Sequence, residues 1–379
     1  MNPESELVEE THRQLVTLTD TDQDPLPIDR LRALVLEQAP LLSADRLQAV
    51  VAAVVSRVEG LGRLDGLLAD PEVTDVLVNG PGPVWIERRG RLCRTAIELT
   101  HSEIEVLVER ILAPLGRRAD RSTPIAEARL PDGSRVHVVL APVAVDGPCV
   151  AIRRFSASPY QLDSFASPQV VEVLRAAVVG GANIVVSGGT GSGKTSLLNA
   201  LAAAVDGDSR IITVEDAAEL RIPGRHVVRF ECRPDNAEGA GGIDLGQLVR
   251  SALRLRPDRL IVGEVRGAEA FDLLQALNTG HDGSMSTCHA NDPLAALRRL
   301  EMLVLMGAPA VPLPAVRELL SAAVDLVVQV VRTDGEARRV HSVHEVGNVD
   351  AAANLGTTAL VEGGLVVGRP QRPVRRERS

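Results

Sequence analysis

Apolar residues recur at helical spacing near the start of the chain. After Ser43, a residue type favoured at helix N-caps, they follow at intervals of three and four: Leu47, Val50, Val51, Val54, Val55 and Val58. This stripe predicts a helix that packs on the next domain or on a neighbouring molecule. The polar, acidic residues 1–25 before it indicate a mobile lead or a short helix, so we assign residues 1–60 to an acidic, helical N-terminal segment.

Short elements of both kinds are predicted over residues 61–155. Apolar residues at 74–81 predict a strand, helical spacing predicts a helix near 102–115, and Asp132-Gly133 between apolar runs is typical of a hairpin turn. This mixture indicates a smaller α/β domain. The Ser- and Pro-rich segment 156–168 that follows is typical of an interdomain linker.

Strands and helices alternate over residues 169–379 in the order typical of a parallel sheet. A buried strand at 183–187 runs into a glycine-rich loop, and helix-forming residues follow that loop. Further apolar runs predict strands at 210–214, 259–263 and 325–331, and we also assign a strand to the serine-rich stretch near 284–288. The pattern therefore predicts an α/β fold with a mainly parallel sheet.

The glycine-rich loop fits the GxxxxGK[ST] pattern of a phosphate-binding P-loop. In such loops the backbone N–H groups and the next helix N-terminus surround nucleotide phosphates. Lys194, the only lysine of the chain, is expected to reach the β- and γ-phosphates, and the Thr195 hydroxyl to bind Mg2+. We therefore predict ATP and Mg2+ as ligands of Gly188, Gly189, Thr190, Gly191, Ser192, Gly193, Lys194, Thr195 and Ser196.

Acidic residues follow two of the other predicted strands. The apolar run 260–262 leads through a glycine to Glu264, the order of a Walker B strand with glutamate in place of aspartate. Glu215 and Asp216 end the strand at 210–214, where one carboxylate can orient an attacking water as a base.

Two histidines, His281 and His289, lie eight positions apart among hydroxyl-bearing residues. A zinc site needs more protein ligands than these two residues provide. The pattern favours a hydrogen-bonding role that couples the γ-phosphate to conformational change, with satisfied structural histidines as the alternative.

Composition narrows the choice of partners and compartment. A net charge of −9 and an aromatic content of 2% are poorly suited to nucleic acid, so no direct nucleic-acid binding is expected. We find no export signal and no run of about 20 apolar residues, which predicts a cytoplasmic protein that meets a membrane only through partners. The arginine-rich end, residues 372–378, is expected to be a solvated tail.

Four ordered segments resemble the Walker A, Asp, Walker B and His boxes of the secretion traffic ATPases: GGTGSGKT, IITVEDAAEL, LRLRPDRLIVGEVRG and NTGHDGSMSTCHAN. Within that superfamily the chain is most similar to the tight-adherence (Tad/Flp) pilus assembly ATPases, the CpaF-like branch. The resemblance runs from about residue 65 to 345. The histidine spacing matches this branch, and the tetracysteine module of type II secretion members is missing.

This resemblance implies a RecA-like ATPase domain preceded by a smaller, PAS-like α/β domain. It further implies a hexameric ring that works with inner-membrane platform proteins and uses Mg-ATP to drive pilin insertion or protein secretion. Glu215 is then the general base, Glu264 the magnesium and water organiser, and His289 the γ-phosphate sensor, with His281 a further nucleotide-site residue. Arginines from the N-terminal domain also reach the nucleotide in that family, and the matching positions are Arg135, Arg153 or Arg154, and Arg129.

Two other functions stay open. A type IV secretion or conjugation ATPase shares the same boxes, and the sequence separates it poorly from a pilus motor. A nucleotide-regulated scaffold without useful turnover is the second alternative, and the intact Glu215 and Glu264 count against it.

Overall fold

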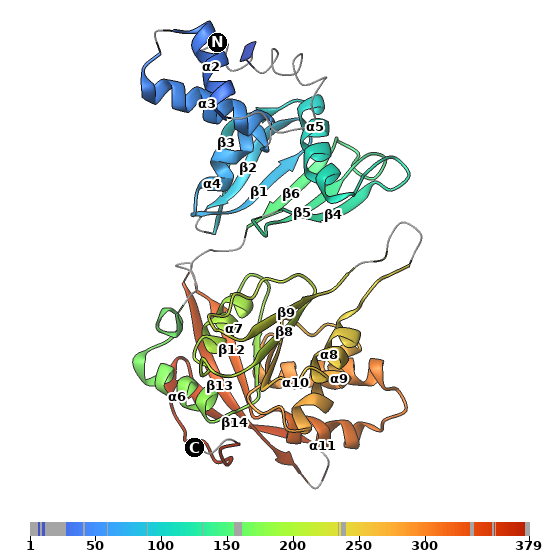
Figure 1. Ribbon diagram of the computed structural model, residues 1–379. Coiled ribbons are helices and arrows are strands. Elements are labelled where there is room, and N and C mark those ends of the chain that lie inside the picture. Colours follow the sequence, from blue (N-terminus) through green and yellow to red (C-terminus); the bar gives the residue numbers. More distant parts are fainter. Residues whose placement is uncertain are drawn as a thin grey trace. The chain divides into compact units, whose positions relative to one another are not determined.

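The structure is a computed structural model of the 379-residue chain. It divides into two compact units, Met1–Ala157 and Ser158–Ser379, and each unit is described by itself (Figure 1). The structure describes residues 7, 10–11, 28–40, 42–58, 60–88, 90–130, 132–154, 161–233, 235, 240–333, 337–350, 352 and 354–375.

Two helices form the N-terminal part of the first unit. They are α2 (Ile28–Gln38) and α3 (Ala44–Val58). The predicted apolar stripe on α3 packs against α2, because the buried side chains of both helices form one small cluster: Leu31, Val35, Val50, Val51 and Val54. The side chains of Val55 and Val58, also in the predicted stripe, lie outside those that the structure describes. Most of the acidic lead at 1–25 lies outside the described residues.

The strands described in the first unit form one six-stranded antiparallel sheet with the order β3-β2-β1-β6-β5-β4. Helix α5 (His101–Leu112) begins with a capping box between Thr100 and Glu103 and buries one apolar face in the core of this unit. The predicted hairpin is confirmed as the β4–β5 pair. The elements are η2 (Gly62–Leu64), α4 (Asp65–Ala69), β1 (Val73–Asn79), β2 (Gly82–Arg88), β3 (Arg91–Leu99), η3 (Ala113–Leu115), β4 (Ile125–Arg129), β5 (Arg135–Val139) and β6 (Cys149–Arg153).

The second unit is built on a sheet in which nine strands are described, in the order β15-β14-β13-β12-β7-β11-β10-β8-β9. The part from β12 to β9 is parallel, as predicted, and β13, β14 and β15 extend it in antiparallel fashion. The strands are β7 (Ile184–Gly188), β8 (Ile211–Glu215), β9 (Val227–Glu231), β10 (Arg259–Val262), β11 (Met285–His289), β12 (Leu326–Arg332), β13 (Arg338–Val349), β14 (Leu355–Glu362) and β15 (Leu365–Val366).

Helices cover both faces of this sheet, because its parallel strands are apolar on both sides (Figure 1). Two separate apolar clusters result, one beneath α6 and α7 and the other beneath α8 to α11. The helices are α6 (Pro168–Val179), α7 (Lys194–Ala202), α8 (Leu245–Leu253), α9 (Glu269–Asn278), α10 (Pro293–Gly307) and α11 (Leu313–Ala323).

The described part of the expected linker is packed against the second unit. A short helical turn, η4 (Leu162–Ser164), and Phe165 place apolar side chains in the α6–α7 cluster, where Leu162 is 3% and Phe165 1% exposed. The Phe165 carbonyl also accepts a hydrogen bond from the Val340 amide. The Ser/Pro-rich composition predicted a linker, because it gave no sign that Leu162 and Phe165 anchor this segment to the core.

The expectation of a solvated tail is wrong for residues 371–375. The buried carboxylate of Glu345 accepts hydrogen bonds from the backbone amides of Gln371 and Arg372. The nearly buried carboxylate of Asp325 pairs with both Arg372 Nη1 at 2.9 Å and Arg375 Nε at 2.6 Å. The tail therefore docks because two buried acids need partners; the rest of it lies outside the described residues.

Candidate nucleotide-binding site

The P-loop follows β7 directly, so the strand fixes where the loop begins. Gly191 and Gly193 have φ angles of 70° and 95°, a left-handed conformation that glycine adopts without a Cβ penalty. A Cβ atom on Gly188 would lie 2.6 Å from the Val330 carbonyl oxygen of β12, so this position also has no room for a side chain. The loop thus brings its backbone close to any bound phosphate.

Lys194 begins helix α7 and bends back over the loop. Its Nζ atom donates a hydrogen bond to the Gly189 carbonyl at 3.0 Å, and Ser192 Oγ donates to the same oxygen at 2.9 Å. Partial burial lowers the pKa of Lys194, and the nearby Glu264 carboxylate opposes that effect. The ammonium therefore stands close to the acid that follows β10, the predicted Walker B strand.

Glu264 lies just beyond β10. In the structure its carboxylate forms an ion pair with Arg266 at 2.5 Å, and the side chain is about one fifth exposed. The pair raises the pKa of Arg266 through the hydrogen bond to Glu264. The Glu264 carboxylate raises the pKa of both Lys194 and Arg266. It is therefore placed to bind a cation at the phosphate end of the loop.

Glu215 ends β8 and is buried, at 2% exposure. Its carboxylate accepts hydrogen bonds from the backbone amides of Glu219 and Leu220, both at 3.0 Å. Burial raises the pKa of Glu215 to about 7, against the lowering effect of those two amides. A Cβ on Gly263 would lie 2.9 Å from Glu215 Cγ, so the two acids of this site end adjacent strands at close range.

His289 ends β11, directly opposite Gly188 in the parallel pairing of β11 with β7. The neighbouring Thr287 donates a hydrogen bond to the Gly263 carbonyl at 2.7 Å, which ties β11 to the Walker B turn. The carboxyl ends of four adjacent strands therefore bring together the P-loop, His289, Glu264 and Glu215, the edge at which open α/β sheets bind ligands.

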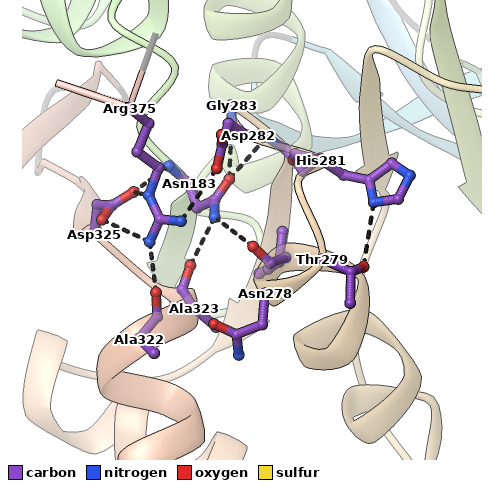
Figure 2. A network of polar contacts seen from close by, with 12 residues as sticks. Asn183, Asn278, Thr279, His281, Asp282, Gly283, Ala322, Ala323, Asp325 and Arg375 are labelled. Atoms are coloured by element: carbon purple, nitrogen blue, oxygen red, sulfur yellow. Dashed lines mark hydrogen bonds and ion pairs between the residues drawn. The ribbon is translucent and has the colours of Figure 1, made fainter.

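His281 does not lie with these residues. It precedes β11, at the opposite end of the strand, where its Nδ1 atom lies 3.1 Å from the Ala276 carbonyl and 3.5 Å from Thr279 Oγ1 (Figure 2). A five-residue strand spans about 16 Å, so the two histidines flank a strand instead of sharing one loop. The expectation that His281 belongs to the nucleotide site is corrected accordingly.

The network in Figure 2 occupies this opposite edge. Asn183 accepts hydrogen bonds from the amides of Gly283 and Ser284, and its own Nδ2 donates to the Ala323 carbonyl at 2.8 Å. Asp325 and Arg375 complete it. These contacts hold the start of β7, β11 and β12 together and leave their other ends to the nucleotide site.

The arginines predicted from the N-terminal domain form a row across its sheet. Residues paired directly in an antiparallel sheet point to the same face, and the pairings run through β1, β6, β5 and β4 as Asp75, Arg153, Arg135 and Arg129. The strand residues adjacent to this row on β1, β6 and β5 are buried in the core: Val76, Ile152 and Val136. The row itself therefore lies on the other face of the sheet. Adjacent like charges repel, and Arg153 Nε offsets part of the repulsion by pairing with Asp75 at 2.9 Å.

Arg154 is placed differently. Its guanidinium donates to the carbonyl oxygens of Asp70 and Val73, the latter at 3.0 Å, and so fastens the loop before β1. Of the two alternatives, the register therefore places Arg153 with Arg135 and Arg129, and it gives Arg154 a local structural contact.

Two further residues border the P-loop and were missed by sequence reasoning. Gln329, 3% exposed on β12, accepts a hydrogen bond from Ser187 and donates to the carbonyls of Asn291 at 3.0 Å and Ala290 at 3.4 Å. A lone glutamine inside an apolar strand was a usable signal, since buried polar groups are normally bonded. The Nη1 atom of Arg338 lies 3.3 Å from Ser196 Oγ. The sequence gives no signal for this residue, because it is one of 40 arginines.

The site suits a Mg2+ ion that takes some of its ligands from a bound nucleotide. Among the described residues, no group of three or more His, Cys, Asp or Glu side chains could hold a metal ion by itself. Mg2+ typically takes only one or two protein oxygens together with substrate phosphates. Thr195, in the first turn of α7, and Glu264 are the residues that would supply those oxygens.

A parallel α/β sheet that carries a P-loop and two acids at its carboxyl edge defines a P-loop nucleotide-binding protein. A family model described as type II/IV secretion system protein matches residues 58–374, so the chain belongs to that family. A putative conjugal transfer protein of Mycobacterium tuberculosis is 38% identical over 320 residues, covering 81% of this chain and 90% of the relative.

One further relative supports the assignment, and one solved structure shares the fold. The type IV secretion system protein PtlH of Bordetella pertussis is 32% identical over 302 residues, which cover 72% of this chain and 89% of that protein. The X-ray structure of the Legionella pneumophila ATPase DotB has a TM-score of 0.52 at 23% identity, over 71% of this chain and 75% of that one, and this likeness shows the fold alone. In the described part of the chain, every helix is too short or too polar to cross a membrane.

Proposed function

We propose that the chain is a Mg2+-dependent ATPase that works as a homo-oligomeric ring, of hexameric type, and powers a type IV secretion or conjugal transfer system. The observation that carries this proposal is the meeting of Lys194, Glu264, Glu215 and His289 at one edge of the parallel sheet. A scaffold without turnover would have no need for two acids at this edge.

Each residue has a distinct role in the proposed hydrolysis. The loop amides and Lys194 would hold the phosphates and Thr195 and Glu264 would hold Mg2+, which when bound would supply positive charge to the phosphate oxygens. Glu215 is the general base, because a carboxyl group with a pKa of about 7 is balanced between accepting and releasing a proton at neutral pH. His289, level with the first P-loop glycine, senses the γ-phosphate.

The arginine row supplies positive charge from the first unit. Arg129, Arg135 and Arg153 lie in one row of paired positions on β4, β5 and β6, and we assign this row a phosphate-binding role. A guanidinium fork suits charge spread over phosphoryl oxygens in the transition state. Whether this row meets its own subunit's nucleotide or a neighbour's is a property of the ring.

The relatives favour transfer of type IV or conjugal kind over the tight-adherence pilus assembly expected from the sequence boxes. Their names are putative conjugal transfer protein and type IV secretion system protein PtlH. Pilus assembly stays the second candidate because of the eight-residue histidine spacing. In both cases we propose a cytoplasmic motor held at the inner membrane by platform proteins, without direct contact to nucleic acid.

Two experiments test this proposal. Sedimentation velocity with a non-hydrolysable ATP analogue should show a hexamer, and a persistent monomer would contradict the ring. A deletion strain complemented with wild type or Glu264→Gln should be assayed for DNA transfer, protein secretion and surface pili. Loss of transfer or secretion with normal pili supports the type IV assignment, and loss of pili alone supports the second candidate.

A further inference from the structure

The order of strands around the P-loop gives a bound nucleotide a direction. On one side of β7 lie β11 and β10, which carry His289 and the turn to Glu264. On the other side lie β12 and β13. Besides Lys194 and Thr195 of the P-loop itself, the groups suited to the γ-phosphate and Mg2+ come from this first side, so a bound nucleotide would extend its adenosine end toward the β12–β13 hairpin.

Arg338 stands on that second side, at the first position of β13, where pairing with Arg332 of β12 fixes its backbone. Its apolar stem lies against the P-loop: a Cβ on Gly193 would overlap Arg338 Cδ and lie 3.2 Å from Cγ and Nε. Its Nη1 atom is 3.3 Å from the hydroxyl of Ser196, in the first turn of α7. The guanidinium therefore reaches the start of the helix from the side away from Glu264.

We propose that Arg338 binds the α-phosphate and ribose end of the nucleotide, an inference that rests on the proposed function and adds a specific residue to it. The Nη1 atom of Arg338 already reaches the first turn of α7 at Ser196, and a phosphate oxygen held there would accept a charge-assisted hydrogen bond, which is stronger than one to a neutral hydroxyl. Gly193 has a second reason to be glycine here, because the stem of Arg338 occupies the space of its side chain.

The α-phosphate is common to ATP and ADP, and it is not the group that reacts. An interaction with it stabilises ground state and transition state alike, so it changes affinity and KM far more than kcat. Loss of one hydrogen bond to a charged group weakens binding by about ten-fold or more. Arg338 is in this respect unlike Glu264, whose loss should affect turnover first.

The test compares Arg338→Met with wild type and with Arg339→Ala. The methionine keeps an apolar stem against Gly193 and removes only the charge, and Arg339 is the exposed neighbour on the alternate face of β13. ATP and ADP affinities are measured by calorimetry, and kcat and KM by phosphate release. We expect Arg338→Met to lose affinity for both nucleotides by about ten-fold, with a matching rise in KM, and Arg339→Ala to resemble wild type.

Unchanged ATP and ADP affinities in a folded Arg338→Met protein would overturn the inference and leave the proposed function standing. A loss confined to ATP, with a fall in kcat, would also overturn it, because that result would place Arg338 at the γ-phosphate. If wild type itself binds neither nucleotide, the proposed function fails and the inference fails with it. Arg338→Lys, which restores charge without the fork, should recover part of the affinity.

Discussion

Glu215→Gln should make the second unit more stable while it abolishes most of the hydrolysis. The carboxylate is buried beside Gly263, and burial raises its pKa from an ordinary 4.5 to about 7. A glutamine has nearly the same shape, and its oxygen can still accept hydrogen bonds from the amides of Glu219 and Leu220. The substitution therefore removes the charge and leaves the main contacts.

The magnitude follows from the pKa. A carboxyl group whose pKa is raised in the folded state costs stability once it ionises, and the displacement from 4.5 to about 7 corresponds to about 3 kcal/mol. This cost is absent well below pH 4.5, grows as the pH rises, and is complete above pH 7. Glu215→Gln should thus gain about 3 kcal/mol at pH 8 and less than about 1 kcal/mol at pH 5.

Urea unfolding followed by far-UV circular dichroism measures the gain. The only tryptophan, Trp85, lies in the first unit, so its fluorescence transition should not move and serves as an internal control. Glu231→Gln is the matched variant, because Glu231 lies directly opposite Glu215 on β9 but is exposed; it should stay within about 0.5 kcal/mol of wild type. A Glu215→Gln protein that is less stable than wild type at pH 8 would refute the reasoning.

The same variant tests the chemistry. A general base contributes about 100-fold or more to a rate, so Glu215→Gln should bind ATP and hydrolyse it at least about 100 times more slowly. In the wild type the base must be ionised, so kcat/KM should fall as the pH drops below about 7. Wild-type turnover at full rate at pH 5 would contradict the assignment of Glu215.

Three further predictions concern the surroundings of the site. Arg375→Ala should lower the free energy of unfolding of the second unit by about 3 kcal/mol, because it removes a partner of the nearly buried Asp325; the exposed Arg369→Ala is the control in the same urea titration. Gly188→Ala should abolish nucleotide binding in a filter assay or prevent folding, since its Cβ has no room beside Val330. Its control is Gly189→Ala, which has open space around its Cβ and should leave the thermal midpoint of the nucleotide-free protein within a few degrees of wild type. Gln329→Leu should reduce kcat, and its effect should not add to that of His289→Ala in a double-mutant cycle, because Gln329 acts through the backbone that follows His289; full additivity would refute that coupling.

Much of the parallel sheet of the second unit could be predicted because most of its strands are apolar runs followed by chemically specific residues. The runs at 210–214, 259–263 and 325–331 correspond to β8, β10 and β12, and the serine-rich stretch at 284–288 corresponds to β11. Because parallel strands end at the same edge, the order of the boxes also brought Glu215, Glu264 and His289 to the P-loop.

The antiparallel extension could not be predicted in the same way. β13 and β14 carry alternating and charged residues, so neither forms an apolar run. For this reason the position of Arg338 beside the P-loop could not be predicted, since it depends on how β13 pairs with β12. The parallel edge strand β9 was missed for a similar reason, because it is half-exposed.

His281 shows the opposite failure. The histidine-containing box placed it near His289, although the strand predicted at 284–288 already lay between the two residues. The tail arginines were misjudged on similar grounds, because the carboxylates that accept their hydrogen bonds, Asp325 and Glu345, lie 50 and 27 residues earlier in the chain. Long-range polar pairs leave no local pattern.

The most direct test of the central claim is Mg2+-dependent ATP turnover, measured as phosphate release, for wild type, Lys194→Ala and Glu264→Gln, together with ATP binding by each. The wild type should hydrolyse ATP and stop when Mg2+ is chelated. Lys194→Ala should lose binding, and Glu264→Gln should bind ATP but hardly hydrolyse it. Equal turnover in all three proteins would contradict the account.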